Sequence, residues 1–106
     1  MNVLIADMEL ESLILTGTSK KYKKVVRNKS LLDGLINTYN ILCVESSTEN
    51  LKNYSYLHYE KLKYEYTGFS SIRIKNNSIE RLIFTEDENG LTVTLIELED
   101  NHYGNK

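Results

Sequence analysis

Hydrophobic positions in the first 17 residues predict a short strand followed by a helix. Residues 2–6 form an apolar run that is typical of a largely buried strand. Leu10, Leu13 and Ile14 then recur at i, i+3 and i+4, the spacing of one helix face, so we expect a helix over about residues 8–16. The expected ends of this helix are Asp7 as its N-cap and Gly17 as its stop.

A second, longer helix is predicted up to about residue 44. Ser30 and Asp33 fit a capping-box-like start, and Gly34 weakens the helix slightly because glycine is a poor helix former. Cys43 falls within the apolar pattern and is expected to be a buried structural thiol. The positions that keep helical spacing are Leu32, Leu35, Ile36, Tyr39, Leu42 and Cys43.

The second half of the chain changes to the two-residue period of strands. Turn signals occur at Asn76-Asn77 and Asn89-Gly90. Helices followed by an antiparallel meander indicate an α+β fold, with an N-terminal strand and helices packed on a mainly antiparallel sheet. A length of 106 residues suits one compact domain over residues 1–106. The predicted strands are 69–75, 79–85 and 91–99.

Charge is unevenly distributed along a chain whose formal net charge is −2. A run of ten residues holds a basic cluster with no acid among its members. Such a cluster can bind phosphate locally on an acidic protein, although from charge alone a solvated helix entrance is the favoured interpretation. The cluster consists of Lys20, Lys21, Lys23, Lys24, Arg27 and Lys29.

Composition also bears on the expected location of the protein. The single cysteine allows no internal disulfide, which fits a reducing compartment. The apolar runs fall far short of the roughly 20 residues that span a membrane, and acids follow the apolar residues 1–6 at once, unlike a signal peptide. We therefore expect a cytoplasmic protein without membrane contact.

Several polar residues from separate elements carry candidate chemistry. Arginines can hold a phosphate bidentately, a lysine can stabilise charge in the transition state, and a histidine can move a proton near neutral pH. Gathered on one exposed face, they suit metal-free RNA cleavage, in which the 2′-oxygen attacks the adjacent phosphorus and the 5′-oxygen leaves with a proton. The candidates are His58, Lys61, Arg73, Arg81, Asp100, Asn101, His102 and Tyr103.

Each candidate also has a structural interpretation. The two arginines alternatively form ion pairs with Glu80 or Glu65. His58 alternatively lies at the surface or in a hydrogen-bonded core, and His102 is alternatively a frayed terminal residue. The eight tyrosines are more often core or sheet-face residues than base-stacking platforms. No glycine-rich phosphate loop and no Cys/His metal spacing occur, so we expect no cofactor and no metal.

Taken in order, four segments of the chain resemble the RelE/ParE toxin superfamily. The nearest branch is the HigB-type toxin, also called the plasmid maintenance system killer protein. The resemblance implies a small RelE-like toxin, held inactive in a hetero-oligomer by a helix-turn-helix antitoxin. It also implies that the free toxin enters the ribosomal A site and cleaves the translated mRNA. The segments are 57–62, 68–74, 81–84 and 99–103, within a matching region of residues 54–104.

The resemblance assigns roles to individual residues. His58 and Lys61 match a His-x-x-Lys motif, and Arg73 and Arg81 match arginines of two successive strands. Asp100 and His102 match a terminal acid and histidine, where His102 would be the general base or acid with His58 as its partner. The arginines and Lys61 would stabilise the phosphate, and the basic cluster and Tyr103 would contact RNA.

The chain departs from the family pattern at Asn101, where much of the family has tyrosine, and places Tyr103 after the histidine instead. Two other interpretations stay open. One is a non-enzymatic, ParE-like toxin that inhibits DNA gyrase. The other is a degenerate copy that only binds the antitoxin.

Overall fold

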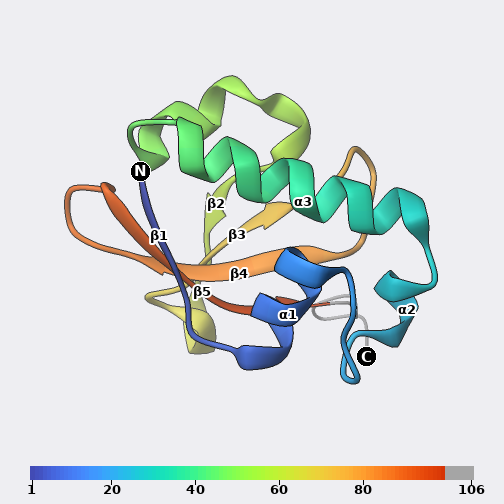
Figure 1. The fold of residues 1–106 in the computed structure, drawn as a ribbon. Coiled ribbons are helices and arrows are strands. Elements are labelled where there is room, and N and C mark those ends of the chain that lie inside the picture. The colour runs from blue at the N-terminus through green and yellow to red at the C-terminus, as the bar shows by residue number, and fades with distance from the viewer. Residues whose placement is uncertain (100–106) are drawn as a thin grey trace.

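The structure, a computed structural model, describes residues 1–99 and contains a five-stranded sheet with helices on one side (Figure 1). The strand order is β1-β5-β4-β3-β2. β1 pairs in parallel with β5, and the other neighbours are antiparallel. The predicted α+β fold is therefore confirmed. The strands are β1 (Asn2–Ile5), β2 (Glu60–Lys61), β3 (Ser70–Arg73), β4 (Arg81–Glu86) and β5 (Thr92–Glu99).

The first predicted helix is confirmed as α1 (Met8–Thr16). Gly17 ends it in the left-handed conformation, with φ of 76°, and donates its N–H to the Leu13 carbonyl oxygen. Asp7 occupies the N-cap position, but its side chain makes no cap hydrogen bond. The Asp7 carboxylate instead accepts a hydrogen bond from the Tyr22 hydroxyl at 3.2 Å.

A short helix, α2 (Lys23–Val26), leads into the long helix α3 (Lys29–Val44). The predicted capping box of Ser30 and Asp33 is wrong. Asn28 is the N-cap, and its side-chain oxygen accepts a hydrogen bond from the Leu31 N–H at 3.2 Å. Ser30 accepts a hydrogen bond from Lys75, and Asp33 pairs with Lys29, so neither side chain is directed at the helix end.

The prediction that Cys43 is buried is also wrong, because its side chain is exposed. Buried positions of α3 include Leu35, Thr38 and Leu42, which follow one stripe of the helix. Consecutive residues lie about 100° apart around a helix, so the position after Leu42 turns toward solvent. The apolar spacing is too coarse to distinguish a stripe residue from its neighbour.

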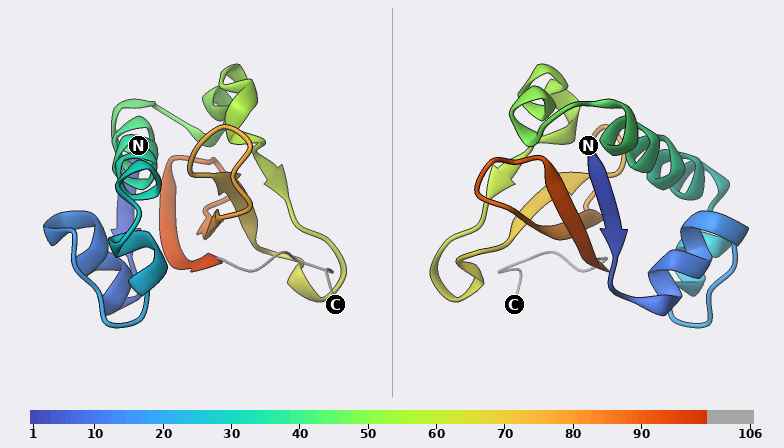
Figure 2. Two further views of the ribbon diagram at one scale, coloured as in Figure 1. Left: turned by 90° about the vertical axis from the view of Figure 1, so that its right-hand side faces the viewer. Right: turned by 60° about the vertical axis from the view of Figure 1, so that its left-hand side comes forward.

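The core lies between α1, α3 and the sheet, as seen where the helices cover one side of the strands (Figure 2). Gly34 permits the closest approach, because a Cβ built there would lie 2.5 Å from the carbonyl oxygen of Ile74. Two turns, 3-10 helices at Thr48–Asn53 and Ser55–Leu57, connect α3 to β2. Fully buried core residues include Leu10, Leu13, Leu35, Leu42, Ile72, Leu82 and Phe84.

The C-terminal meander agrees with the sequence prediction, with shorter strands. The turn between β3 and β4 places Asn77 at φ 64°, and the turn between β4 and β5 places Gly90 at φ 68°. Both are left-handed conformations that asparagine and glycine adopt most readily. The turns therefore fix the register that sets Arg73 opposite Arg81.

Candidate active site

Arg73 of β3 and Arg81 of β4 are direct cross-strand partners. Ile72 and Leu82, the preceding and following residues of the same strands, are also partners and belong to the buried core under the helices. Successive strand residues point to opposite faces. The two arginines therefore lie on the face of the sheet away from the helices.

Glu60 of β2 joins the arginines on this face. Its carboxylate lies 2.6 Å from an Arg81 guanidinium nitrogen, and the same nitrogen lies 3.3 Å from the Ser71 hydroxyl. Ser71 is the ladder partner of Glu60. We call the side chains of Glu60, Ser71, Arg73 and Arg81 the arginine face.

The two arginines differ in their partners. The Arg81 side chain is 24% exposed and is held by Glu60. The Arg73 Nε is buried and has no hydrogen-bond partner within residues 1–99. A buried donor without an acceptor costs free energy, and like charges placed opposite each other on two strands repel. An anion bound between the guanidinium groups would relieve the repulsion between them.

The sequence allowed a structural alternative in which these arginines pair with Glu80 or Glu65. Within residues 1–99, neither arginine forms such an ion pair. Glu80 is almost fully buried and pairs with Lys24 at 2.9 Å. Arg81 pairs with Glu60 instead, a residue that the sequence interpretation missed. Glu60 stands only two residues after the candidate His58 in the sequence, so it could have been considered. The face of the sheet on which Glu60 lies depends on the pairing of β2 with β3, and a strand of two residues is too short to predict from the sequence.

Within residues 1–99, neither His58 nor Lys61 forms a hydrogen bond or ion pair with the side chains of the arginine face. His58 ends the turn Ser55–Leu57 with φ 52° and is exposed. It lines a shallow hollow together with Leu51 and Tyr54. Lys61 is the ladder partner of Ser70, whose hydroxyl binds Glu86, so Lys61 lies on the opposite face from Glu60.

Glu86 is the centre of a hydrogen-bond network behind this strand. Its carboxylate accepts hydrogen bonds from the hydroxyls of Thr48 at 2.7 Å, Tyr59 at 2.7 Å and Ser70 at 2.8 Å. Burial acts to raise the pKa of Glu86, but these hydrogen bonds outweigh it and hold the pKa below the usual range. Burial, followed by the bond to Glu86, raises the pKa of Tyr59 to about 12.

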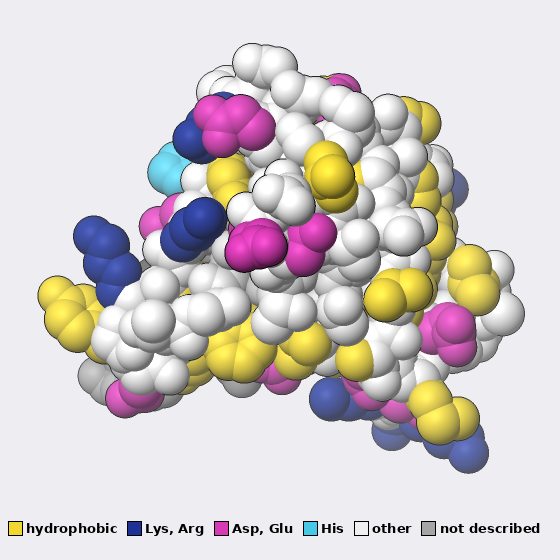
Figure 3. Space-filling view, turned by 90° about the vertical axis from the view of Figure 1, so that its left-hand side faces the viewer, with side chains coloured by type: hydrophobic (Ala, Val, Ile, Leu, Met, Phe, Trp, Pro, Cys, Tyr) yellow, Lys and Arg dark blue, Asp and Glu magenta, His cyan; other side chains and the backbone are white. Residues whose placement is uncertain are grey.

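This network adjoins a cavity of about 290 Å³ on the face that carries the turn between β4 and β5. Acidic and basic side chains are mixed across that face (Figure 3). Tyr59 precedes Glu60, and its ring stacks on Phe84 with centroids 6.2 Å apart. The network therefore fixes the segment from which Glu60 reaches Arg81.

The remaining site residues predicted from the sequence are close to the C-terminus. Asp100, Asn101, His102 and Tyr103 lie outside the described residues. The last described residue, Glu99, is the ladder partner of Arg81. β5 therefore ends beside the arginine face.

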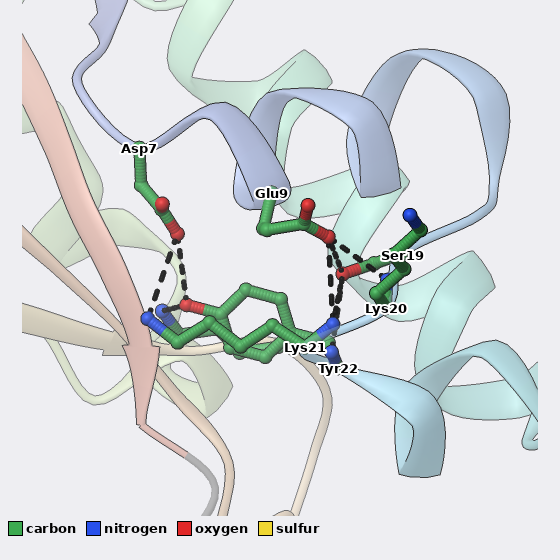
Figure 4. Close-up of polar contacts among 7 residues, drawn as sticks. Asp7, Glu9, Ser19, Lys20, Lys21 and Tyr22 are labelled. Atoms are coloured by element: carbon green, nitrogen blue, oxygen red, sulfur yellow. Dashed lines mark hydrogen bonds and ion pairs between the residues drawn. The ribbon is translucent and has the colours of Figure 1, made fainter.

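The basic cluster is anchored to the N-terminal helix by two acids (Figure 4). The Glu9 carboxylate accepts hydrogen bonds from the Ser19 hydroxyl at 2.8 Å and the Lys20 N–H at 2.9 Å. These bonds, the Ser19 bond above all, hold the pKa of Glu9 below its usual value. The Tyr22 hydroxyl donates to Asp7 and accepts from the N–H of Leu98 on β5.

Ion pairs divide the basic cluster into two groups. Lys21 approaches Asp7 at 3.9 Å, and Lys24 and Lys29 bind Glu80 and Asp33. The other three members form no ion pair with residues 1–99. They are Lys20, Lys23 and Arg27. The hydrogen bond between the Tyr22 hydroxyl and the Leu98 N–H ties the segment that carries these charges to the end of β5.

Residues 1–99 contain neither a candidate membrane span nor a candidate metal-binding cluster. No helix in this part of the chain combines the length and apolarity needed to cross a membrane. The same residues contain no grouping of three His, Cys, Asp or Glu side chains suited to a metal ion.

Comparison with known proteins identifies the fold. No protein-family model and no curated protein sequence matches the chain. Among solved structures, a YoeB/ParE toxin from Agrobacterium tumefaciens is similar with TM-score 0.53 and 16% identity, over 96% of this chain and 100% of that chain. A YoeB dimer from Staphylococcus aureus is similar with TM-score 0.51 and 23% identity, over 97% of this chain and 98% of that chain.

A heterotetrameric YoeB-YefM toxin-antitoxin complex from Staphylococcus aureus gives a weaker likeness, with TM-score 0.48 and 22% identity, over 97% of this chain and 98% of that chain. The first two matches show that the chain has the fold of the YoeB/ParE toxins. The fold implied by the resemblance to the RelE/ParE superfamily is thereby confirmed.

Proposed function

We propose that this chain is the toxin of a toxin-antitoxin pair and that it cleaves mRNA at the arginine face. The observation that carries the proposal is the cross-strand pair of Arg73 and Arg81 with Glu60 held against one of them. Arginine pairs of this kind suit the planar, bidentate recognition of a phosphate. The shared fold with YoeB/ParE toxins supports the same function.

The proposed reaction needs a base, an anion site and an acid. Glu60 takes the proton of the 2′-hydroxyl, whose oxygen attacks the adjacent phosphorus while the bond to the 5′-oxygen breaks. Arg73 and Arg81 hold the phosphate oxygens as negative charge increases on them. His102 gives a proton to the leaving 5′-oxygen, as its sequence position suggests. The products are a 2′,3′-cyclic phosphate and a 5′-hydroxyl.

The other sequence-based assignments remain part of the proposal. His58 and Lys61 flank Glu60 in the sequence, and Asp100 and Tyr103 follow Glu99 in the sequence. Lys20, Lys23 and Arg27 offer unpaired charge for ribosomal RNA. A helix-turn-helix antitoxin, cytoplasmic action on the ribosome and the HigB branch are proposed on the family resemblance.

The test is to induce the protein in bacterial cells and to map the 5′ ends of mRNA. We expect Arg73→Ala and Glu60→Gln each to lower cleavage by about 100-fold or more, the range for removing a group that stabilises the transition state. His102→Ala should lower it similarly. Lys52→Ala, which removes only an exposed pair with Glu49, is the matched control and should cleave normally. Normal cleavage by both Arg73→Ala and Glu60→Gln would refute the assignment.

One observation favours a second candidate, a non-enzymatic toxin that binds DNA gyrase. Arg81 already has Glu60 as a partner, so this pair can also be a purely structural ion pair. Growth arrest with inhibited supercoiling and intact mRNA would support this candidate. Induction without growth arrest would instead indicate a copy that only binds the antitoxin.

A further inference from the structure

The loop between β2 and β3 exposes a tyrosine that the folded core does not use. Tyr64 is 91% exposed and has φ of 60°, a left-handed conformation that is unusual for a bulky residue. Its side chain forms no hydrogen bond and no ring contact with residues 1–99. Both features cost free energy in the isolated protein, and no packing within the described residues compensates for them.

The loop holds Tyr64 in a defined position. The Tyr64 carbonyl oxygen accepts hydrogen bonds from the Thr67 N–H at 3.0 Å and from the Thr67 hydroxyl at 2.6 Å. The N–H of Tyr66 donates to the Lys63 carbonyl oxygen at 3.1 Å. The exposed ring therefore stands on a hydrogen-bonded turn, the 3-10 helix Tyr64–Tyr66.

This turn lies next to the arginine face. The N–H of Leu62 donates to the Phe69 carbonyl oxygen at 2.8 Å, which continues the β2–β3 ladder from Glu60 to the turn. The turn extends from the sheet on the side away from α1 and α3 (Figure 2). Tyr64 is four residues from Glu60, so their Cα atoms are at most about 14 Å apart.

Charge and a second ring suit the same surface to an RNA strand. Lys63 is exposed and directly precedes Tyr64, and Glu65 is the acid of the turn. Tyr66 is 40% exposed. Proteins that bind single-stranded nucleic acid combine basic groups along the backbone with exposed aromatic rings under the bases.

We infer that Tyr64 is a stacking platform for an unpaired base of the RNA strand whose phosphate occupies the arginine face. The inference rests on the proposed function and adds to it a residue that positions the RNA strand. Stacking on the exposed ring would hold the strand a few nucleotides from the cleaved bond. Because every base has a π-face, the contact favours unpaired RNA over a particular sequence.

The test measures the binding of a fluorescent RNA oligonucleotide, methylated at every 2′-oxygen so that it cannot be cleaved. Tyr64→Gly is the informative variant, because glycine removes the ring and adopts the same φ without strain. We expect binding to weaken by about 5- to 150-fold, the range for one lost base stack. The thermal midpoint should stay equal or rise.

Control variants separate stacking from other effects. Tyr64→Phe keeps the ring and should bind within about twofold of the unsubstituted protein. Met8→Ala removes another exposed apolar side chain, on α1, and should bind normally. Unchanged binding by Tyr64→Gly, or no RNA binding by the unsubstituted protein, would overturn the inference. If Tyr64→Gly abolishes growth arrest while RNA binding is unchanged, the ring contacts a protein and the inference is also wrong.

This result is independent of the test of the proposed function. If Tyr64→Gly weakens RNA binding but mRNA is still cleaved in cells, the proposed roles of Arg73 and Glu60 are unaffected. Tight RNA binding through Tyr64 without any mRNA cleavage in cells would keep the platform and reject the catalytic proposal.

Discussion

Replacing Glu86 by glutamine should destabilise the protein in a way that depends on pH. The carboxylate of Glu86 joins three segments, because it accepts hydroxyl hydrogen bonds from Thr48, Tyr59 and Ser70. Glutamine has nearly the same shape but no charge. The substitution therefore tests the charge of the network rather than its packing.

The magnitude follows from the three hydrogen bonds. A bond to a charged group contributes about 1.5–3 kcal/mol, and a bond between neutral groups about 0.5–1.5 kcal/mol. Three weakened bonds thus suggest a loss of about 3 kcal/mol. Glu86 is only half-buried, and an amide costs less to desolvate than a carboxylate, so we expect a net loss of about 1–2 kcal/mol at pH 7.

The sign of the pH dependence follows from the pKa of Glu86, which lies below its usual value in the folded protein. Stability from such a group is present above the unfolded pKa of about 4.3 and is lost as pH falls through the folded pKa. The difference between Glu86→Gln and the unsubstituted protein should therefore be largest near pH 7. It should shrink below about pH 4.

Urea unfolding at several pH values from neutral to strongly acidic measures this difference. Glu88→Gln is the matched control, because Glu88 is an exposed acid in the following turn, and it should change stability little at any pH. Equal stability of Glu86→Gln and the unsubstituted protein at pH 7 would refute the reasoning. A loss that stays constant down to low pH would show that shape, not charge, holds the network.

Three further predictions concern stability. Gly34→Ala should lower the free energy of unfolding by about 1–2 kcal/mol despite a helix-propensity gain of about 1 kcal/mol, since its Cβ would meet the Ile74 carbonyl oxygen at 2.5 Å; equal or higher stability in urea would contradict this. Asn28→Ala should lower it by about 1 kcal/mol, because the cap bond to Leu31 is lost; an unchanged urea midpoint would contradict this. The pKa of Tyr59 is raised to about 12, so the free energy of unfolding should fall as pH rises from about 10 to 12. The fall should be less than the roughly 2.7 kcal/mol that corresponds to two pK units. Tyr59→Phe should reduce this fall in alkaline unfolding titrations.

Elements with a clear hydrophobic period were predictable from the sequence. The i, i+3, i+4 spacing around Leu10 located α1, and Gly17 marked its end. The asparagine and glycine turns located the three strands of the meander. In each case the local preference of the sequence agrees with the conformation that the residues have in the folded protein.

Features set by contacts between distant segments were not predictable in the same way. Gly34 looked like a weak point of α3, and the structure shows instead that α3 packs against the backbone at Ile74 there. Ser30 looked like part of a cap, but Lys75, which is 45 residues later in the sequence, donates a hydrogen bond to its hydroxyl. Local spacing contains no information about which distant segment will lie against a side chain.

The same distinction between local and long-range features applies to the residues of the candidate site. The pairing of Arg73 with Arg81 followed from a hairpin whose turn was visible in the sequence. Glu60 was missed because its partner strand β3 begins ten residues later, at Ser70, across a loop without a strand period. Lys61 was grouped with the arginines, but strand alternation turns it toward Ser70 and away from Glu60.

The acidic net charge of the chain does not oppose a phosphate site, because several acids are engaged within the fold. Glu9 binds the loop of the basic cluster, Glu80 is buried against Lys24, and Glu86 holds three hydroxyls. The Arg73 Nε, by contrast, is buried without a partner among residues 1–99. Attraction for an anion depends on the charges that remain unpaired around the binding position, because paired charges largely cancel within a short distance. An acidic protein of this kind can therefore keep a guanidinium group without an ion pair among residues 1–99 at its candidate phosphate site, and the sign of its total charge is a poor guide to its ligand.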